Sequence, residues 1–168
     1  MARFSRKARG RRTAVAVLVV PMLVLLGPAG VAAANDPGAD GRDPYQYPST
    51  GNSCAKNASI VASGSVFGGS GRKLGTGYLW YSWTCGTNWS EVRTSVSAGG
   101  SSGWLYTDAV TGPPFEQQIY QWDGNFPVGA RSWSDMVYAP TTCASGSVGI
   151  GLANLGDSGM ATLQDPTC

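Results

Sequence analysis

The sequence predicts an all-β fold, a single small antiparallel sandwich or barrel-like domain with two disulfide bonds. Turn signals rich in glycine, proline, serine and asparagine recur about every ten residues, the spacing typical of sandwiches and barrels. No convincing amphipathic helix pattern appears beyond residue 34. The chain holds 24 glycines and only 13% charged residues, a composition that fits short strands joined by tight turns.

The predicted strands follow one another between these turns. Segment 74–85 is the strongest candidate because it is rich in aromatic residues. Turns are expected at 68–73, 98–103 and 123–125, and the prolines of 113–115 break the chain. The other strands are expected at residues 58–67, 89–97, 104–111, 116–122, 131–139 and 147–155.

Residues 1–34 have the pattern of a secretory signal peptide. The first twelve residues carry six basic residues and no acid, an apolar run spans Thr13–Leu26, and Ala32-Ala33-Ala34 ends it. The run is too short for a typical membrane-spanning helix. We therefore expect cleavage after Ala34 and a secreted, extracellular or cell-envelope protein with no membrane span. Arg11-Arg12 leaves the twin-arginine route open, although the general secretory route is favoured.

The charge of the chain changes once this leader is set aside. Six of the 12 basic residues lie within it and all 10 acidic residues lie beyond it, so the remainder has a net charge of −4. A mildly acidic surface argues against binding nucleic acid or anionic membranes, both of which need a basic face.

Four cysteines lie beyond the leader, an even number that indicates two disulfide bonds in an exported protein. Three pairings are open, and we expect Cys54–Cys143 and Cys85–Cys168. A zinc site is the alternative, but the cysteines are not clustered and the chain has no histidine. We predict no metal and no cofactor.

Residues 35–53 precede the β-rich, disulfide-bonded domain, which we place at 54–168. This segment is rich in proline, glycine and aspartate and shows no apolar periodicity, so it predicts an extended, solvated arm. Its aspartates do not have the spacing of a calcium-binding loop.

The segment 78–89, YLWYSWTCGTNW, concentrates aromatic side chains in one strand and the turn after it. In a strand, Leu79 and Tyr81 face one side of the sheet and Tyr78 and Trp80 the other. One of these faces must be core, and the second is either packed across strands or a platform for a ligand. The candidate binding residues are the tryptophans that remain exposed among Trp80, Trp89, Trp104, Trp122 and Trp133.

This run resembles the signature of a secreted actinomycete family known only as domain of unknown function number 2690. The matching positions are Cys54-Ala55, 79–89, Trp133-Ser134-Asp135-Met136 and Cys143-Ala144. Trp80 stands where the family has arginine, Trp133 replaces a tyrosine, and Cys168 lies beyond the family's end. The resemblance implies secretion and a β-rich disulfide domain, but no reaction.

Two serine motifs resemble those of hydrolases. Gly156-Asp157-Ser158-Gly159 resembles the nucleophile loop of trypsin-like proteases, and 99–103 fits the G-x-S-x-G pattern of hydrolase elbows. Both mechanisms need a histidine base, and the chain has none. We therefore predict that neither serine is a nucleophile.

Acidic residues leave a glycoside hydrolase open in principle. Nothing in the sequence pairs any two of them, and Asp135 is expected to bond a backbone amide or cap a turn. The candidates are Glu91, Asp108, Glu116, Asp123 and Asp135.

These observations predict a non-enzymatic binding or structural protein. Exposed tryptophans would stack on the sugar rings of a cell-wall polysaccharide or anchor a secreted partner protein. The alternative is an extracellular protease or enzyme inhibitor that uses the segment TGPPF, residues 111–115, as a rigid loop. A carboxylate-based hydrolase ranks last.

Overall fold

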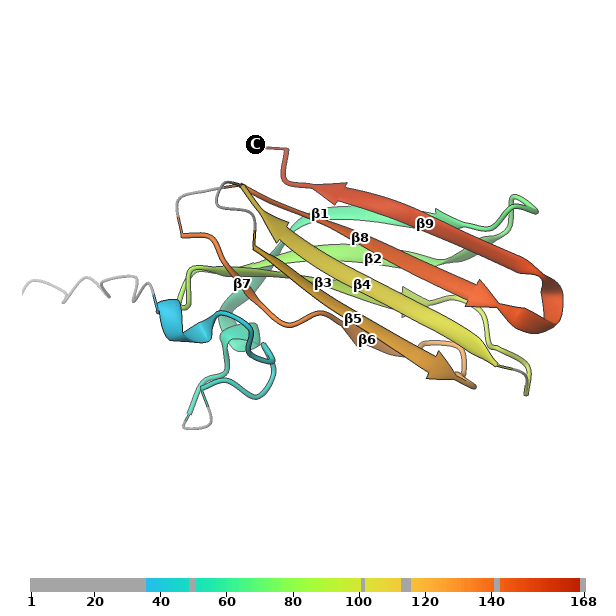
Figure 1. The fold of residues 1–168 in the computed structure, drawn as a ribbon, viewed down its shortest axis with the longest axis horizontal. Helices are drawn as coiled ribbons and strands as arrows, with labels where there is room; N and C mark the ends of the chain where they lie inside the picture. Colours follow the sequence, from blue (N-terminus) through green and yellow to red (C-terminus); the bar gives the residue numbers. More distant parts are fainter. Residues whose placement is uncertain (1–35, 49–50, 101, 113–115, 141–142, 167–168) are drawn as a thin grey trace, which may run out of the picture. The chain divides into compact units, whose positions relative to one another are not determined.

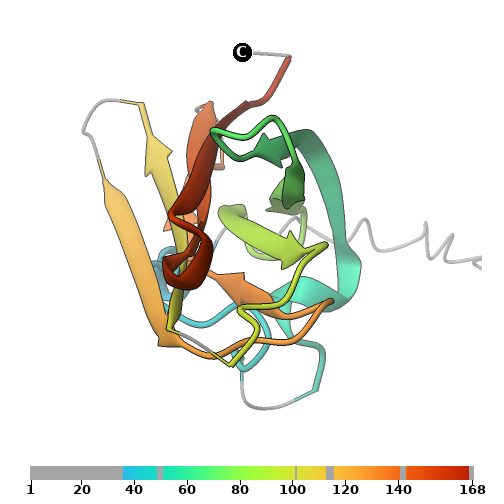
Figure 2. The same ribbon diagram turned by 90° about the vertical axis from the view of Figure 1, so that its right-hand side faces the viewer.

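The computed structural model describes residues 36–48, 51–100, 102–112, 116–140 and 143–166. Within these ranges the chain forms nine strands in two antiparallel sheets, which lie against each other as two layers (Figures 1 and 2). The predicted all-β sandwich is therefore confirmed. The only helices among these residues are short 3-10 turns, and none of them is long and apolar enough to cross a membrane.

Sheet A consists of strands in the order β1-β2-β3-β6, with β7 also paired to β3. Its strands are β1 (Ala58–Phe67), β2 (Lys73–Ser82), β3 (Thr87–Thr94), β6 (Arg131–Trp133) and β7 (Val137–Tyr138). Sheet B has the order β5-β4-β8-β9. Its strands are β4 (Gly103–Thr111), β5 (Gln117–Gly124), β8 (Ala144–Leu152) and β9 (Asp157–Gln164).

The main core lies between the two sheets and follows the two-residue period of the strands. Leu79 and Val92 point inward from sheet A, and Leu105, Ile150 and Leu163 meet them from sheet B, all at most 2% exposed. Small residues interleave with these large ones, which lets the inner faces interdigitate.

Two strand assignments differ from those that the sequence predicted. The predicted strand 131–139 is divided into β6 and β7: the amide of Ser134 still bonds Ser90 of β3, but the amide of Met136 turns to the carbonyl of Arg42 in the N-terminal segment. Strand β9 was not predicted at all. It contains the Asp157-Ser158 pair, whose setting is an ordinary edge strand.

The N-terminal segment 36–57 is a packed layer, so the prediction of an extended, solvated arm is wrong. It contains two 3-10 turns, η1 (Pro37–Ala39) and η2 (Cys54–Asn57), and it covers the outer face of sheet A. Ala39 and Cys54 are fully buried there, in a second apolar cluster with Trp89 and Met136. The aspartates predicted to be solvated instead hold turns, as when Asp36 accepts from the amide of Gly38.

A disulfide joins Cys54 to Cys85 with a sequence separation of 31 residues. This bond overturns both predicted pairs, Cys54–Cys143 and Cys85–Cys168. Cys143 is also disulfide-bonded, and Cys168 lies outside the described residues. Closing a loop of this length stabilises the fold by about 4 kcal/mol in the chain-entropy model, and it ties η2 to the turn between β2 and β3.

Candidate functional site

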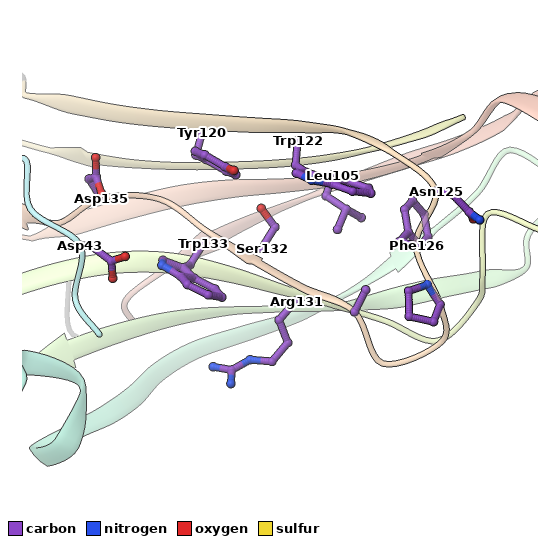
Figure 3. Close-up of a pocket in the computed structure, with 12 residues that line it drawn as sticks. Asp43, Leu105, Tyr120, Trp122, Asn125, Phe126, Arg131, Ser132, Trp133 and Asp135 are labelled. Carbon is purple, nitrogen blue, oxygen red and sulfur yellow. The ribbon is translucent and has the colours of Figure 1, made fainter. Parts of the chain in front are cut away.

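The candidate site is a pocket of about 290 Å³ at the edge where β5 of sheet B faces β6 of sheet A (Figure 3). A more open depression of about 400 Å³ lies over β1 and the chain after β9, but no charged or aromatic side chain lines it. The β5–β6 pocket is lined by both charged and aromatic side chains. Its lining residues are Asp43, Leu105, Tyr120, Trp122, Asn125, Phe126, Pro127, Ala130, Arg131, Ser132, Trp133 and Asp135.

The wall from sheet B is aromatic. Tyr120 and Trp122 both lie on the inner face of β5, and β5 is an edge strand, so no strand pairs with it on its outer side. Trp122 also packs against the main core. Tyr120 is 46% exposed. The indole of Trp122 lies over Gly124, whose φ of 153° and missing side chain leave it room, and its other neighbour is Phe126 at 6.1 Å between ring centroids.

The wall from sheet A is the three-residue strand β6. Ser132 points inward between the sheets, and its hydroxyl is aimed toward the aromatic wall (Figure 3). Ser132 is only 4% exposed, yet its Oγ has no hydrogen-bond partner among the described residues. A buried hydroxyl without a partner costs stability unless something else satisfies it. Trp133 follows on the opposite face and forms the lower rim.

Buried Glu91 of β3 anchors β6. Its Oε1 accepts from the Nε of Arg131 at 2.8 Å and of Arg93 at 2.5 Å, and its Oε2 accepts from the Arg131 Nη2 at 2.9 Å and the Tyr45 hydroxyl at 2.5 Å. Glu91 is fully buried and has lost its contact with water. These four hydrogen bonds replace the ones that water would make to its two oxygens. The Tyr45 ring also meets Trp133 edge-on at 4.8 Å, which fixes the lower rim.

The titration of this cluster follows from its hydrogen bonds. Burial alone would raise the pKa of Glu91, but the donors from Arg131, Tyr45 and Arg93 outweigh burial and lower it. Burial and the bond to Glu91 raise the pKa of Tyr45 to about 12. Glu91 is therefore an ionised structural anchor.

Two carboxylates lie at one end of the pocket, Asp43 from the N-terminal layer and Asp135 from the loop after β6 (Figure 3). Asp43 accepts from the Tyr45 amide at 2.8 Å, so it is held in a turn. Asp135 is not hydrogen-bonded to any described residue, which corrects the prediction that it caps a turn. Partial desolvation raises the pKa of Asp135, and the charge of Asp43 adds to this.

The structure divides the five predicted binding tryptophans among three places. Trp122 and Trp133 line the pocket together. Trp80 and Trp89 stack on each other at 6.1 Å beneath the N-terminal layer, and Trp89 is fully buried, so neither is an open platform. Trp104 lies on the outer face of sheet B over Gly149 and Gly151, away from the pocket.

Sequence reasoning missed several pocket residues. Tyr120, Ser132 and Asp43 were not candidates. Tyr120 and Trp122 are two residues apart in a strand, so they share one face, and this spacing was the available signal. Trp83, which was not in the predicted set, is the most exposed tryptophan at 64% but lies outside the pocket.

The other acidic residues and serine motifs considered in the sequence do not come together in a common site. Asp108 is buried and accepts from Tyr106, Gln117 and the Ser147 amide. Asp123 accepts from Gln121 on the outer face of sheet B. Asp157 accepts from Ser70, while Ser101 and residues 113–115 lie outside the described ranges. Within those ranges no three metal-ligating residues cluster.

No family model, curated protein or solved structure matches this chain. The resemblance to the actinomycete family therefore stays a prediction, and the function has to be argued from the pocket itself.

Proposed function

We propose that this chain is a non-enzymatic binding domain that holds a saccharide ring in the β5–β6 pocket. The observation that supports it most is an aromatic wall, made of exposed Tyr120 and partly buried Trp122, opposite the buried and unpartnered hydroxyl of Ser132. Sugar rings present apolar C–H faces and hydroxyl edges, and they need both kinds of partner at once.

The dimensions and lining of the pocket support this proposal. Its volume of about 290 Å³ is small and suits one ring better than an extended ligand. The polar side chains Asn125 and Ser132 are mixed with the aromatic ones, so a ligand with hydroxyl groups finds hydrogen-bond partners along the pocket.

We also propose that the protein acts outside the cell, on a cell-wall or matrix polysaccharide. The leader pattern of residues 1–34 and the Cys54–Cys85 bond support this location, because disulfides persist in oxidising compartments. Membership of the actinomycete family would agree with it.

The test is retention of the folded domain on insoluble polysaccharides, with chitin and peptidoglycan as N-acetylated probes and chitosan as the probe with free amines. Tyr120→Ala removes half of the aromatic wall at a site that is 46% exposed, so the fold should survive while retention falls about tenfold. Trp83→Ala is the matched control, since it removes a more exposed aromatic side chain outside the pocket. Equal retention of both variants would contradict the proposal.

A carboxylate-based hydrolase is the second candidate, and one observation favours it. Asp135 has a raised pKa, as a general acid needs, and it shares the pocket with Asp43. Release of new reducing ends from a soluble glycan, abolished by Asp135→Asn, would support hydrolysis over binding. We expect no release.

A further inference from the structure

We infer that the acidic end of the β5–β6 pocket selects a protonated amino group, so that the saccharide bound there is an amino sugar with a free amine. This inference rests on the proposed saccharide binding and names its ligand more closely. It depends on the charges at one end of the pocket, on the aromatic rings beside them and on the buried, unpartnered hydroxyl of Ser132.

The charges around the pocket do not cancel. Asp43 and Asp135 both line it, and Arg131 is the third charged residue of the lining. Arg131 is committed elsewhere, because its Nε and Nη2 bind the two oxygens of Glu91 at 2.8 and 2.9 Å. The two aspartates are therefore left without a cation of the described chain, and they repel each other.

The aromatic rings beside these carboxylates suit the same ligand. Trp133 and Tyr120 line the same pocket as Asp43 and Asp135, and Figure 3 draws all four toward one end. An ammonium group gains attraction both from carboxylates and from the faces of such rings. A neutral acetamide still offers one N–H donor and an apolar methyl group, but it lacks the charge that the carboxylates and ring faces attract, and an anionic sugar would be repelled.

Ser132 supplies an independent observation that a polar ligand belongs here. Ser132 is 4% exposed, its hydroxyl points toward the pocket, and no described group forms a hydrogen bond with that hydroxyl. A ring hydroxyl or ring oxygen of the sugar would satisfy it while the amine lies at the acidic end.

The experiment is calorimetric titration of the full domain with glucosamine oligomers and with N-acetylglucosamine oligomers of the same length, at a pH where the amine is protonated. The wild type should bind the free amine about fivefold to tenfold more tightly than the acetylated form. Asp135→Asn should remove this preference, leaving the two within about twofold. Asp123→Asn is the matched control, because it removes a carboxylate of β5 outside the pocket.

The outcomes separate the two proposals. Equal affinity of the wild type for both oligomers, or a preference that Asp135→Asn retains, would overturn the amine selectivity and leave saccharide binding in place. Binding of neither oligomer would overturn the proposed function and the selectivity together. Asp135 is exposed and makes no hydrogen bond to the described chain, so the variant should fold, and a thermal melt checks this.

Discussion

The two long edges of the sandwich are built from different residues. Between β1 and β9 the packing is tight at Gly64, where an added Cβ would lie 3.3 Å from Leu163 and 3.6 Å from Ala161. Along β5 and β6 the facing residues are Tyr120, Trp122 and Ser132, and they enclose a pocket. At Gly64 the first edge is closely packed, and the depression over β1 and the chain after β9 has no charged or aromatic side chain. At the second edge, large rings opposite a short strand line a pocket that also holds charged side chains. The first edge therefore contributes packing, and the charged and aromatic side chains suited to a ligand lie at the second.

The largest expected effect comes from breaking the closed edge. A Cβ at Gly159 would lie 1.9 Å from the carbonyl oxygen of Phe67, so Gly159→Val has to push β9 away from β1. We expect a loss of about 3 kcal/mol or more in the free energy of unfolding, measured by urea denaturation.

Gly69→Ala is the control for this substitution. Its Cβ would meet nothing closer than the Asp157 carboxylate at 3.9 Å, so its unfolding free energy should change by less than about 0.5 kcal/mol. If Gly159→Val were as stable as Gly69→Ala, the two edges would not be in contact as described.

A smaller loss should follow from loosening the strand that forms the lower wall of the pocket. Glu91→Gln keeps the shape of the side chain but removes the charge that binds Arg131 and Arg93. Both arginines are partly exposed, so we expect a loss of about 2 kcal/mol rather than the full cost of a buried unpaired ion. Glu116→Gln, an exposed acid, should change little.

The same cluster predicts a pH dependence. The pKa of Glu91 is lowered in the folded state from its ordinary value of 4.5, so its ionised form stabilises the fold above that value. This contribution is lost as the pH falls through the lowered pKa. Urea denaturation at a series of acidic pH values should show a steeper loss for the wild type than for Glu91→Gln, and parallel curves would contradict the anchoring role.

The smallest effect on stability should be at Ser132, with the opposite sign. Its hydroxyl is buried without a partner, so Ser132→Ala should leave unfolding free energy unchanged or raise it by up to about 1 kcal/mol. Affinity for the saccharide should fall at the same time, as expected of a functional group that costs stability.

Ser134→Ala is the matched control on the same segment. The Ser134 hydroxyl is buried and accepts from the Ser90 amide at 3.2 Å, so its loss should cost about 1 kcal/mol and leave binding unchanged. Equal destabilisation by both serine substitutions would show that Ser132 has a structural partner.

Local patterns predicted the strands better than the contacts between them. Strand β1 was predicted with its observed bounds, because turn residues flank a β-branched run. Strand β9 was missed because Ser158, Gly159 and Thr162 carry little apolar signal, although Leu163 fills the core. The N-terminal segment looked solvated by composition, and only tertiary contacts bury its Ala39.

The site was predicted in part. Trp122 and Trp133 were candidates, but nothing in the sequence indicated that β5 and β6 face each other across the sandwich. That juxtaposition depends on strand order. The partner of Cys54 follows instead from the β1–β2 hairpin, whose register places Ala58 opposite Ser82 and so brings Cys54 near Cys85. Trp80 and Trp89 carried the same sequence signal as the pocket tryptophans, yet the N-terminal layer covers them.

The most direct test of the binding pocket is to follow the six tryptophan indole N–H signals by NMR while a glucosamine oligomer is added. The β5–β6 pocket predicts that the signals of Trp122 and Trp133 shift with the ligand, while those of Trp83 and Trp104 stay in place. Shifts confined to Trp83 or Trp104, with Trp122 and Trp133 unchanged, would contradict the assignment of this edge as the binding site.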